Sequence, residues 1–348
     1  MNKKKPILGL LIVLLILPLF YSLIINRKED KISNTYYNLG TVNEITLYNI
    51  KKSNVEKIFE ECASILNDID NKMSETINSS EINNINKNAG KNYVKVSKDT
   101  YKVIKESLIY SKMSNNTFDI AVGPIIDLWS IGTDNARVPS DNEIKNTLPL
   151  VNYKDVLIND EDYSVKLAKE NMKINLGGIA KGYAADKIYA YLKSQKVESA
   201  IINLGGNIYA LGNKENNEPF SIGVQDPTKP RGNSIGNIKV SDKSVVTSGI
   251  YERYLEKNNK IYHHMINPKD GYPFDSNLSS VTIISNSSMD CDALSTTTFG
   301  LGLDKGRKLI ESLDNVDAIF ITKNKEIYLS KNSKNKFNLT DPSFIIKE

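Results

Sequence analysis

One stretch of the sequence joins an apolar run, two glycines and a helix start: Ile174-Asn175-Leu176-Gly177-Gly178-Ile179-Ala180-Lys181-Gly182-Tyr183. It predicts a strand that runs into the glycine pair and then directly into a helix with an early lysine. This layout suits a pyrophosphate, because glycines let the backbone come close and free N–H groups at a helix start point at an anion. Gly-Gly before a helix also occurs as a plain turn, so the stretch alone leaves both interpretations open.

Outward from this stretch, the pattern predicts helices and strands without the regular βαβ alternation of a doubly wound sheet, which indicates an α+β fold. Helices are expected over 53–73, with Ser53 and Glu56 as a capping box, over 97–113, over 178–195 and after Ser288, which would be the cap of the last one. Strands are expected at 41–48, 200–203, 208–211, 220–225, 235–240, 245–247 and 280–285, with a hairpin around Asn258-Asn259 and a final strand pair around Asn324-Lys325. Residues 26–35 read as a short linker and 74–92 as mostly loop.

The composition limits the classes of function. The chain has 348 residues, 40% of them hydrophobic and 25% charged, with a net charge of +4. Such a small charge gives no support for nucleic-acid binding. Cys62 and Cys291 are the only cysteines. Both fall on predicted amphipathic helices, so we expect buried free thiols rather than a disulfide or a metal site.

Residues 7–25 are almost wholly apolar and follow Lys3, Lys4 and Lys5. This length is close to the roughly 20 residues that cross a bilayer as a helix. A cleaved signal peptide would have a shorter apolar region and small residues at its end. We therefore predict an uncleaved membrane anchor over residues 1–29, with the lysines on the cytoplasmic side and residues 30–348 as an extracytoplasmic domain.

The two histidines, His263 and His264, are neighbours in a predicted strand. Neighbouring strand residues point to opposite faces, so at most one of them faces a given cleft. Histidine suits a general base near neutral pH, but a surface strand histidine with no catalytic role is an equal possibility from this stretch alone.

Asp292 and Thr296 are four residues apart on a predicted helix, which puts both side-chain oxygens on one face. A carboxylate and a hydroxyl, completed by carbonyl and phosphate oxygens, suit Mg²⁺ or Ca²⁺ and not zinc. The alternative is an ordinary capped helix start, where Asp and Ser are favoured in any case.

Taken in order, the motifs of this chain resemble those of the FAD:protein FMN transferases, the ApbE family. The similarity extends over about residues 36–330 and rests on several motifs in one order rather than on any single one. These motifs are Leu39-Gly40-Thr41, Met73-Ser74 with Ser80-Glu81-Ile82, Phe118-Asp119 through Pro124 to Trp129, Leu176 to Gly182, Asn203-Leu204-Gly205-Gly206-Asn207, Thr247-Ser248-Gly249, His264 to Pro268 with Gly271-Tyr272-Pro273, and Asp292 to Thr296.

The resemblance implies a single two-lobed, T-fold-like α+β domain that binds FAD between its lobes, after an N-terminal transmembrane helix. It implies metal-dependent transfer of the FMN part of FAD to a threonine or serine of extracytoplasmic redox subunits or flavin-carrying domains, with release of AMP. His264 would be the base, and Lys181 would stabilise the phosphates. The metal ligands would be the Gly178 carbonyl, Asp292 and Thr296. The residues that would contact FAD are Leu39, Thr76, Thr117, Phe118, Asp119, Asn175, Lys181 and Ile266.

The chain departs from the family pattern at four positions. Leu39 replaces a methionine, Thr76 an aromatic residue, and Asn175 and Asn267 aspartates. An asparagine keeps hydrogen-bonding capacity but loses the negative charge. Two other functions need nearly the same residues: a pyrophosphatase that cuts FAD to FMN and AMP, and a flavin-binding module without catalysis.

Overall fold

The computed structural model describes residues 28–214 and 217–347, which include a nine-stranded sheet. The order of its strands is β1-β2-β6-β7-β10-β13-β14-β15-β17. Their bounds are Lys28–Asn38, Thr41–Lys51, Ser199–Leu204, Asn207–Gly212, Lys243–Gly249, Leu278–Ser285, Asp317–Thr322, Glu326–Leu329 and Ile345–Lys347. Neighbouring strands run antiparallel except β15 and β17, which are parallel. This arrangement confirms the predicted α+β class.

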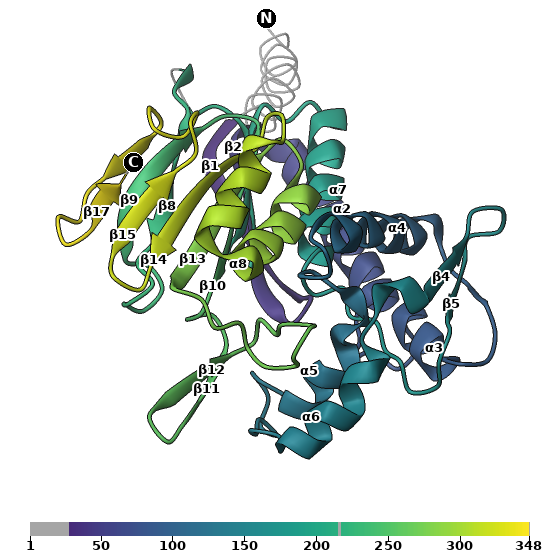
Figure 1. The fold of residues 1–348 in the computed structure, drawn as a ribbon. Coiled ribbons are helices and arrows are strands. Elements are labelled where there is room, and N and C mark those ends of the chain that lie inside the picture. The colour runs from purple at the N-terminus through teal and green to yellow at the C-terminus, as the bar shows by residue number, and fades with distance from the viewer. Residues whose placement is uncertain (1–27, 215–216, 348) are drawn as a thin grey trace, which may run out of the picture.

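Different elements cover the two faces of this sheet (Figure 1). One face packs on three long helices, α2 (Lys52–Met73), α7 (Ala180–Ser194) and α8 (Ser288–Glu311), and their apolar sides form the main core. The other face packs on a three-stranded sheet in the order β16-β9-β8. The bounds of these strands are Phe337–Leu339, Ser234–Val240 and Phe220–Gln225.

A second group of elements lies beside the main sheet (Figure 1). It contains the helices α3 (Glu81–Lys87), α4 (Lys98–Met113), α5 (Gly123–Trp129) and α6 (Asp141–Thr147), with the short helices η1 (Ile120–Val122), η2 (Leu148–Leu150) and η3 (Tyr153–Asp155). It also contains a small sheet of β3 (Val94–Lys95), β5 (Ser164–Leu167) and β4 (Val156–Asn159). A hairpin of β11 (Tyr254–Lys257) and β12 (Lys260–His263) projects from the molecule near α5 and α6.

Several local predictions are confirmed. The buried face of α2 runs from Val55 to Met73. Asn258 and Asn259 form the turn of the β11–β12 hairpin, and both have positive φ, which asparagine tolerates. Cys62 and Cys291 are free and buried, in α2 and α8 respectively.

The region 74–92 is mostly loop, as predicted, and contains the short helix α3. Three other predictions are wrong. Residues 28–38 form an edge strand rather than a linker. Helix α2 starts after Lys51, which makes no side-chain cap, so Ser53 and Glu56 form no capping box. Helix α8 is capped by Ser287, not by Ser288.

The predicted strand before the glycine pair is also absent. The backbone N–H of Ile174 donates to the Asn86 side chain at 2.8 Å, and the Ile174 carbonyl accepts from the Asn86 amide at 3.1 Å. The N–H of Asn175 donates to the Ile120 carbonyl at 2.8 Å. The Asn86 side chain and the Ile120 carbonyl thus make the backbone hydrogen bonds of this segment. In a sheet, a neighbouring strand would make them.

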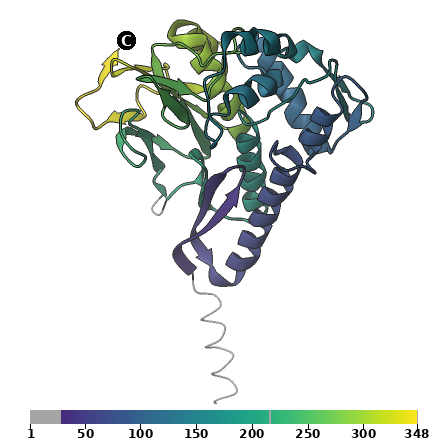
Figure 2. The same ribbon diagram turned by 90° about the horizontal axis from the view of Figure 1, so that it is seen from below.

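No helix in the described part of the chain is long and apolar enough to cross a membrane. The predicted anchor at residues 7–25 lies outside the described residues. Strand β1 begins at Lys28, and Figure 2 shows β1, β2 and α2 running side by side at one end of the molecule.

Candidate functional site

The first turn of α7 faces Asp292 of α8. Lys181 Nζ lies 3.4 Å from both carboxylate oxygens of Asp292 and donates to the Gly177 carbonyl at 3.0 Å. The backbone N–H of Gly182 donates to Asp292 Oδ2 at 3.0 Å. The Asp292 side chain is only 6% exposed, so a buried carboxylate, a lysine and the free N–H of a helix start meet at one point.

Close packing of α7 on α8 makes this contact possible. A Cβ atom at Gly182 would lie 2.3 Å from the Ser288 carbonyl oxygen and 2.6 Å from Met289 Cα. One turn later, Asp186 accepts the N–H groups of Ser288 and Met289 at 2.7 and 2.9 Å, at the start of α8. Burial raises the pKa of Asp186 to about 6. Gly182 and Asp186 thus fix the two helices, and with them Lys181 relative to Asp292.

The residues predicted to bind a metal lie near one another. A Cβ atom at Gly178 would be 3.7 Å from Thr296 Oγ1 and 3.1 Å from the ring of Phe118. The Thr296 hydroxyl lies 3.3 Å from Ser248 Oγ, and Asp292 is one helical turn earlier in α8. Carboxylate, hydroxyl and carbonyl oxygens form the donor set that Mg²⁺ and Ca²⁺ prefer. Within residues 28–214 and 217–347 there is no cluster of three His, Cys, Asp or Glu that could hold a metal.

His264 directly follows β12, and its ring is half-buried. The Arg253 carbonyl lies 3.0 Å from the His264 backbone N and 3.2 Å from its Nδ1. A carbonyl only accepts, so Nδ1 carries the proton and Nε2 is left as the acceptor. Desolvation lowers the pKa of His264 to about 4. The hydrogen bond to the Arg253 carbonyl raises this pKa, and the positive charges of His263, Arg253 and Lys181 lower it. A neutral imidazole with a free Nε2 is the form that a general base requires.

His263 points the other way, as the strand alternation predicts. Its ring is 6% exposed, packs edge-on against Phe299, and has Nε2 3.0 Å from the Phe274 carbonyl. Burial lowers its pKa to about 4. His263 therefore has a structural position, and His264 is the histidine that contacts Arg253.

Two predicted flavin contacts lie in a polar network near the glycine pair. Asn175 Oδ1 accepts the N–H of Gly177 at 2.7 Å, and its amide donates to Glu75 at 2.5 Å. Burial raises the pKa of Glu75, while the Asn175 bond lowers it. Thr76, next in the chain, is exposed and shares a 2.9 Å hydrogen bond with Ser74.

Leu39 lies at the turn between β1 and β2, where Leu39 and Gly40 both have positive φ. Its N–H donates to Asp70 at 3.0 Å. The Arg253 side chain donates to the Gly40 carbonyl at 3.0 Å. Arg253 thus contacts this turn with its side chain and His264 with its backbone carbonyl. Neither Arg253 nor Glu75 is predicted from the sequence, because nothing in their local sequence distinguishes them from other surface charges.

The remaining predicted flavin contacts are buried in the structure. Phe118 and Thr117 donate their N–H groups to Ser114 Oγ at 2.9 and 3.1 Å. Asp119 accepts the N–H groups of Ala121 and Tyr153 at 2.7 and 2.9 Å, and burial raises its pKa to about 6. Ile266 is 8% exposed and packs in an apolar cluster with Trp129. Of these side chains, the Phe118 ring lies next to Gly178.

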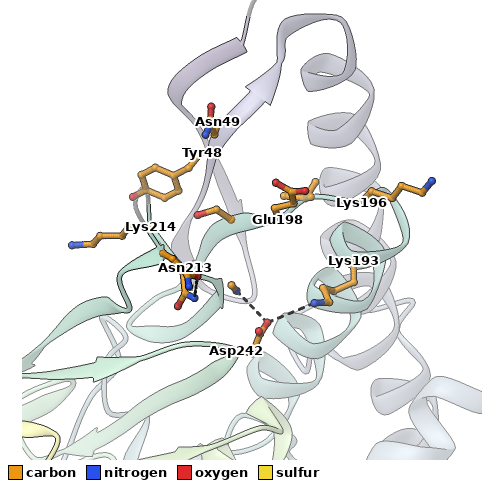
Figure 3. A pocket seen from close by; sticks show the side chains of 12 residues that line it. Tyr48, Asn49, Lys193, Lys196, Glu198, Asn213, Lys214 and Asp242 are labelled. Atoms are coloured by element: carbon orange, nitrogen blue, oxygen red, sulfur yellow. Dashed lines mark hydrogen bonds and ion pairs between the residues drawn. The ribbon is translucent and has the colours of Figure 1, made fainter.

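A surface pocket of about 500 Å³ lies elsewhere, between β2, the end of α7 and the β6–β7 pair (Figure 3). Tyr48, Lys196 and Lys214 line it. Asp242 at its wall accepts the N–H of Gly212 at 3.1 Å and pairs with Lys193 at 3.9 Å. None of the predicted site residues lines this pocket, so it is separate from the α7–α8 site.

The comparisons with known proteins agree on one family. The ApbE family profile matches residues 39–320. The FAD:protein FMN transferase of Klebsiella pneumoniae (strain 342) is 39% identical over 265 residues, which are 76% of this chain and 82% of that protein. The FAD:protein FMN transferase of Treponema pallidum (strain Nichols) is 32% identical over 323 residues, 89% of each chain.

Solved structures extend this agreement to the fold. The crystal structure of the ApbE protein from Thermotoga maritima superposes with a TM-score of 0.81 at 33% identity, covering 88% of this chain and 99% of that one. The flavin transferase ApbE from Vibrio cholerae has a TM-score of 0.79 and covers 89% and 100% of the two chains, and at 23% identity it supports the fold alone. This chain is therefore an enzyme that belongs to the ApbE family.

Proposed function

We propose that this enzyme transfers the FMN part of FAD to a threonine or serine hydroxyl of a partner protein and releases AMP. The observation that carries the proposal is the contact of Lys181 and the Gly182 N–H with buried Asp292 at the start of α7. The relatives named FAD:protein FMN transferase support the same reaction.

His264 would take the proton of the acceptor hydroxyl on Nε2, because Nδ1 is occupied by the Arg253 carbonyl. The hydroxyl oxygen then attacks the phosphorus of the FMN half. A new P–O bond forms, and the bond from this phosphorus to the bridging oxygen breaks, so that AMP leaves with the bridging oxygen. Lys181, in the first turn of α7, would stabilise negative charge on the pyrophosphate oxygens.

We further propose that a divalent cation, Mg²⁺ or Ca²⁺, is held by Asp292, Thr296 and the Gly178 carbonyl. When bound, it would neutralise phosphate charge during the reaction. Asp292 Oδ2 accepts the Gly182 N–H at 3.0 Å, and Lys181 lies 3.4 Å from both oxygens, so each carboxylate oxygen retains a lone pair for a cation.

The apolar segment at residues 7–25 leads us to propose that the chain is anchored in the cell membrane with residues 30–348 on the extracytoplasmic side. The acceptors would then be extracytoplasmic redox subunits or flavin-carrying domains.

The test uses the full chain in detergent micelles with FAD, Mg²⁺ and a flavin-acceptor domain that contains a Ser/Thr-Gly-Ala-Thr sequence. Intact mass of the acceptor is measured with and without a chelator. We expect a mass increase of one FMN that the chelator abolishes. AMP and free FMN with an unmodified acceptor would instead identify a pyrophosphatase, and bound FAD without turnover would identify a binding module.

A further inference from the structure

Helix α3 brings the loop after α2 against the segment that precedes the glycine pair. The Asn83 amide donates to the Glu75 carbonyl at 2.6 Å. Asn86, three residues later on the same face of α3, exchanges two hydrogen bonds with the backbone of Ile174. Glu75 and Asn175, which are 100 positions apart in the sequence, are neighbours as a result.

The side chain of Asn175 lies between a carboxylate and a backbone N–H. Its Nδ2 donates to Glu75 Oε2 at 2.5 Å, and its Oδ1 accepts the N–H of Gly177 at 2.7 Å. If the amide were turned by half a rotation, its NH₂ group would face the N–H of Gly177 and its oxygen would face the carboxylate. Both contacts would be repulsive, because a carboxylate only accepts and an N–H only donates. Glu75 therefore allows Asn175 a single orientation.

This orientation of Asn175 determines how the glycine pair meets the start of α7. A Cβ atom at Gly177 would lie 2.9 Å from Asn175 Oδ1, so the contact requires a glycine at this position. The Gly177 carbonyl accepts from Lys181 Nζ at 3.0 Å, and Lys181 in turn lies 3.4 Å from Asp292. A continuous series of contacts thus connects Glu75 with the lysine of the proposed site.

The Glu75 carboxylate also has charged neighbours. Burial raises the pKa of this carboxyl, and the negative charge of Asp127 raises it further. The hydrogen bond from Asn175 lowers the pKa, and so do the positive charges of Lys173 and Arg253. The amide and the two cations therefore favour the ionised form, which is the form that orients the amide.

We propose that Glu75 is a positioning residue for FMN transfer: its carboxylate orients Asn175 and, through the glycine pair, Lys181. This inference rests on the proposed function, in which Lys181 stabilises charge on the pyrophosphate. It assigns Glu75 no contact with FAD. What matters at position 75 is then an acceptor that faces the amide at position 175.

The first test is Asn175→Asp in the full chain, assayed by the acceptor mass as above. One oxygen of the new carboxylate can still accept the N–H of Gly177, but the other faces Glu75 where the amide donor was. Two carboxylates so close cannot both ionise without repulsion, so we expect transfer at pH 8 to slow roughly tenfold or more. The rate should recover as the pH falls to 5, because the pair then shares one proton. The parent should stay constant over this range, since the pKa of His264 is about 4.

The second test exchanges the two partners. In the double variant Asn175→Asp with Glu75→Gln, the amide at position 75 donates to the carboxylate at position 175. Transfer at pH 8 should return to within about threefold of the parent, because the charge-assisted hydrogen bond is restored. The recovery at low pH should disappear. The matched control is Glu61→Gln, which removes an exposed carboxylate from α2 and should keep the parent rate and pH profile.

Urea unfolding gives a readout that does not depend on turnover. Asn175→Asp should unfold at a lower urea concentration than the parent at pH 8, and the difference should shrink at pH 5. The reason is that a carboxyl whose pKa is raised in the folded state destabilises that state only when it is ionised.

Two kinds of result would overturn these proposals separately. A parent enzyme that transfers no FMN would refute the proposed function. A parent that transfers FMN, with Asn175→Asp equally fast at pH 8, would refute the positioning role alone. So would an Asn175→Asp variant that is slow at every pH and is not restored by Glu75→Gln.

Discussion

Gly182 provides a test in which two physical effects predict opposite signs. In the interior of a helix, replacing glycine with alanine stabilises the folded state by about 1 kcal/mol. At Gly182 the added Cβ would lie 2.3 Å from the Ser288 carbonyl oxygen and 2.6 Å from Met289 Cα. Ordinary contacts of a Cβ atom begin at 3.4 Å, so α7 and α8 would have to separate by about 1 Å.

Both neighbouring atoms belong to the backbone of α8 and cannot be relieved by a rotamer change. Overpacking of this kind costs about 1–3 kcal/mol, and here we expect the upper part of that range. The net effect of Gly182→Ala should be a loss of about 1–2 kcal/mol of unfolding free energy. Separation of the helices should also move Lys181 away from Asp292, now 3.4 Å apart, and slow FMN transfer.

The assay is urea unfolding of the parent and the variant, monitored by circular dichroism. Ala190→Gly on the exposed side of the same helix is the control, and it should lose about 1 kcal/mol through propensity alone. If Gly182→Ala were as stable as the parent or more stable, the close α7–α8 contact would have no energetic role and our reasoning would fail.

Three further substitutions test the site. His264→Ala should keep FAD affinity and lose transfer, and equal transfer by variant and parent across pH 6–8 would remove His264 from the role of base. In the parent, the initial rate of transfer should stay constant as pH falls from 8 to about 5 and then drop with a midpoint near 4. The reason is that His264 stays neutral until the pH reaches its lowered pKa. A midpoint near 6.5 would contradict this. Asp292→Ala should abolish both turnover and the effect of a chelator, measured by acceptor mass. In Arg253→Lys the lysine cannot make the same bond to the Gly40 carbonyl, so the rate of FMN transfer should fall at least tenfold. The pH midpoint should stay the same, because the backbone carbonyl at position 253 still accepts from His264.

Most helices and turns could be predicted because short stretches of sequence specify them. The hairpin at Asn258-Asn259 depends on residues that accept positive φ, and asparagine is recognisable as such a residue in the sequence. Strand β1 carries no such signal. It is a polar edge strand, and Tyr36 is the one buried residue among its described side chains. The strand therefore depends on its backbone pairing with β2.

The site was predictable only in part, for the same reason. The helical spacing placed Asp292 and Thr296 on one face of α8, but it carried no information that Lys181, more than a hundred residues earlier, would face them. The extended segment at Ile174 was mistaken for a strand because its backbone partner is the Asn86 side chain, a contact between residues 88 positions apart. Arg253 acquires its position between Gly40 and His264 only from the packing of two distant turns.

The length of the β1–β2 pair bears on the distance from a membrane at which this enzyme would act. Lys28 pairs with Lys51 at one end of the pair, and the turn at Leu39-Gly40, tied to Arg253, forms the other end. Each strand has 11 residues, which span about 35 Å. With residues 7–25 in a bilayer, as proposed, the Leu39-Gly40 turn that Arg253 contacts would lie at most about 35 Å beyond Lys28, the first residue of β1. The enzyme would then select acceptors by where their threonine stands above the membrane as well as by the sequence around it.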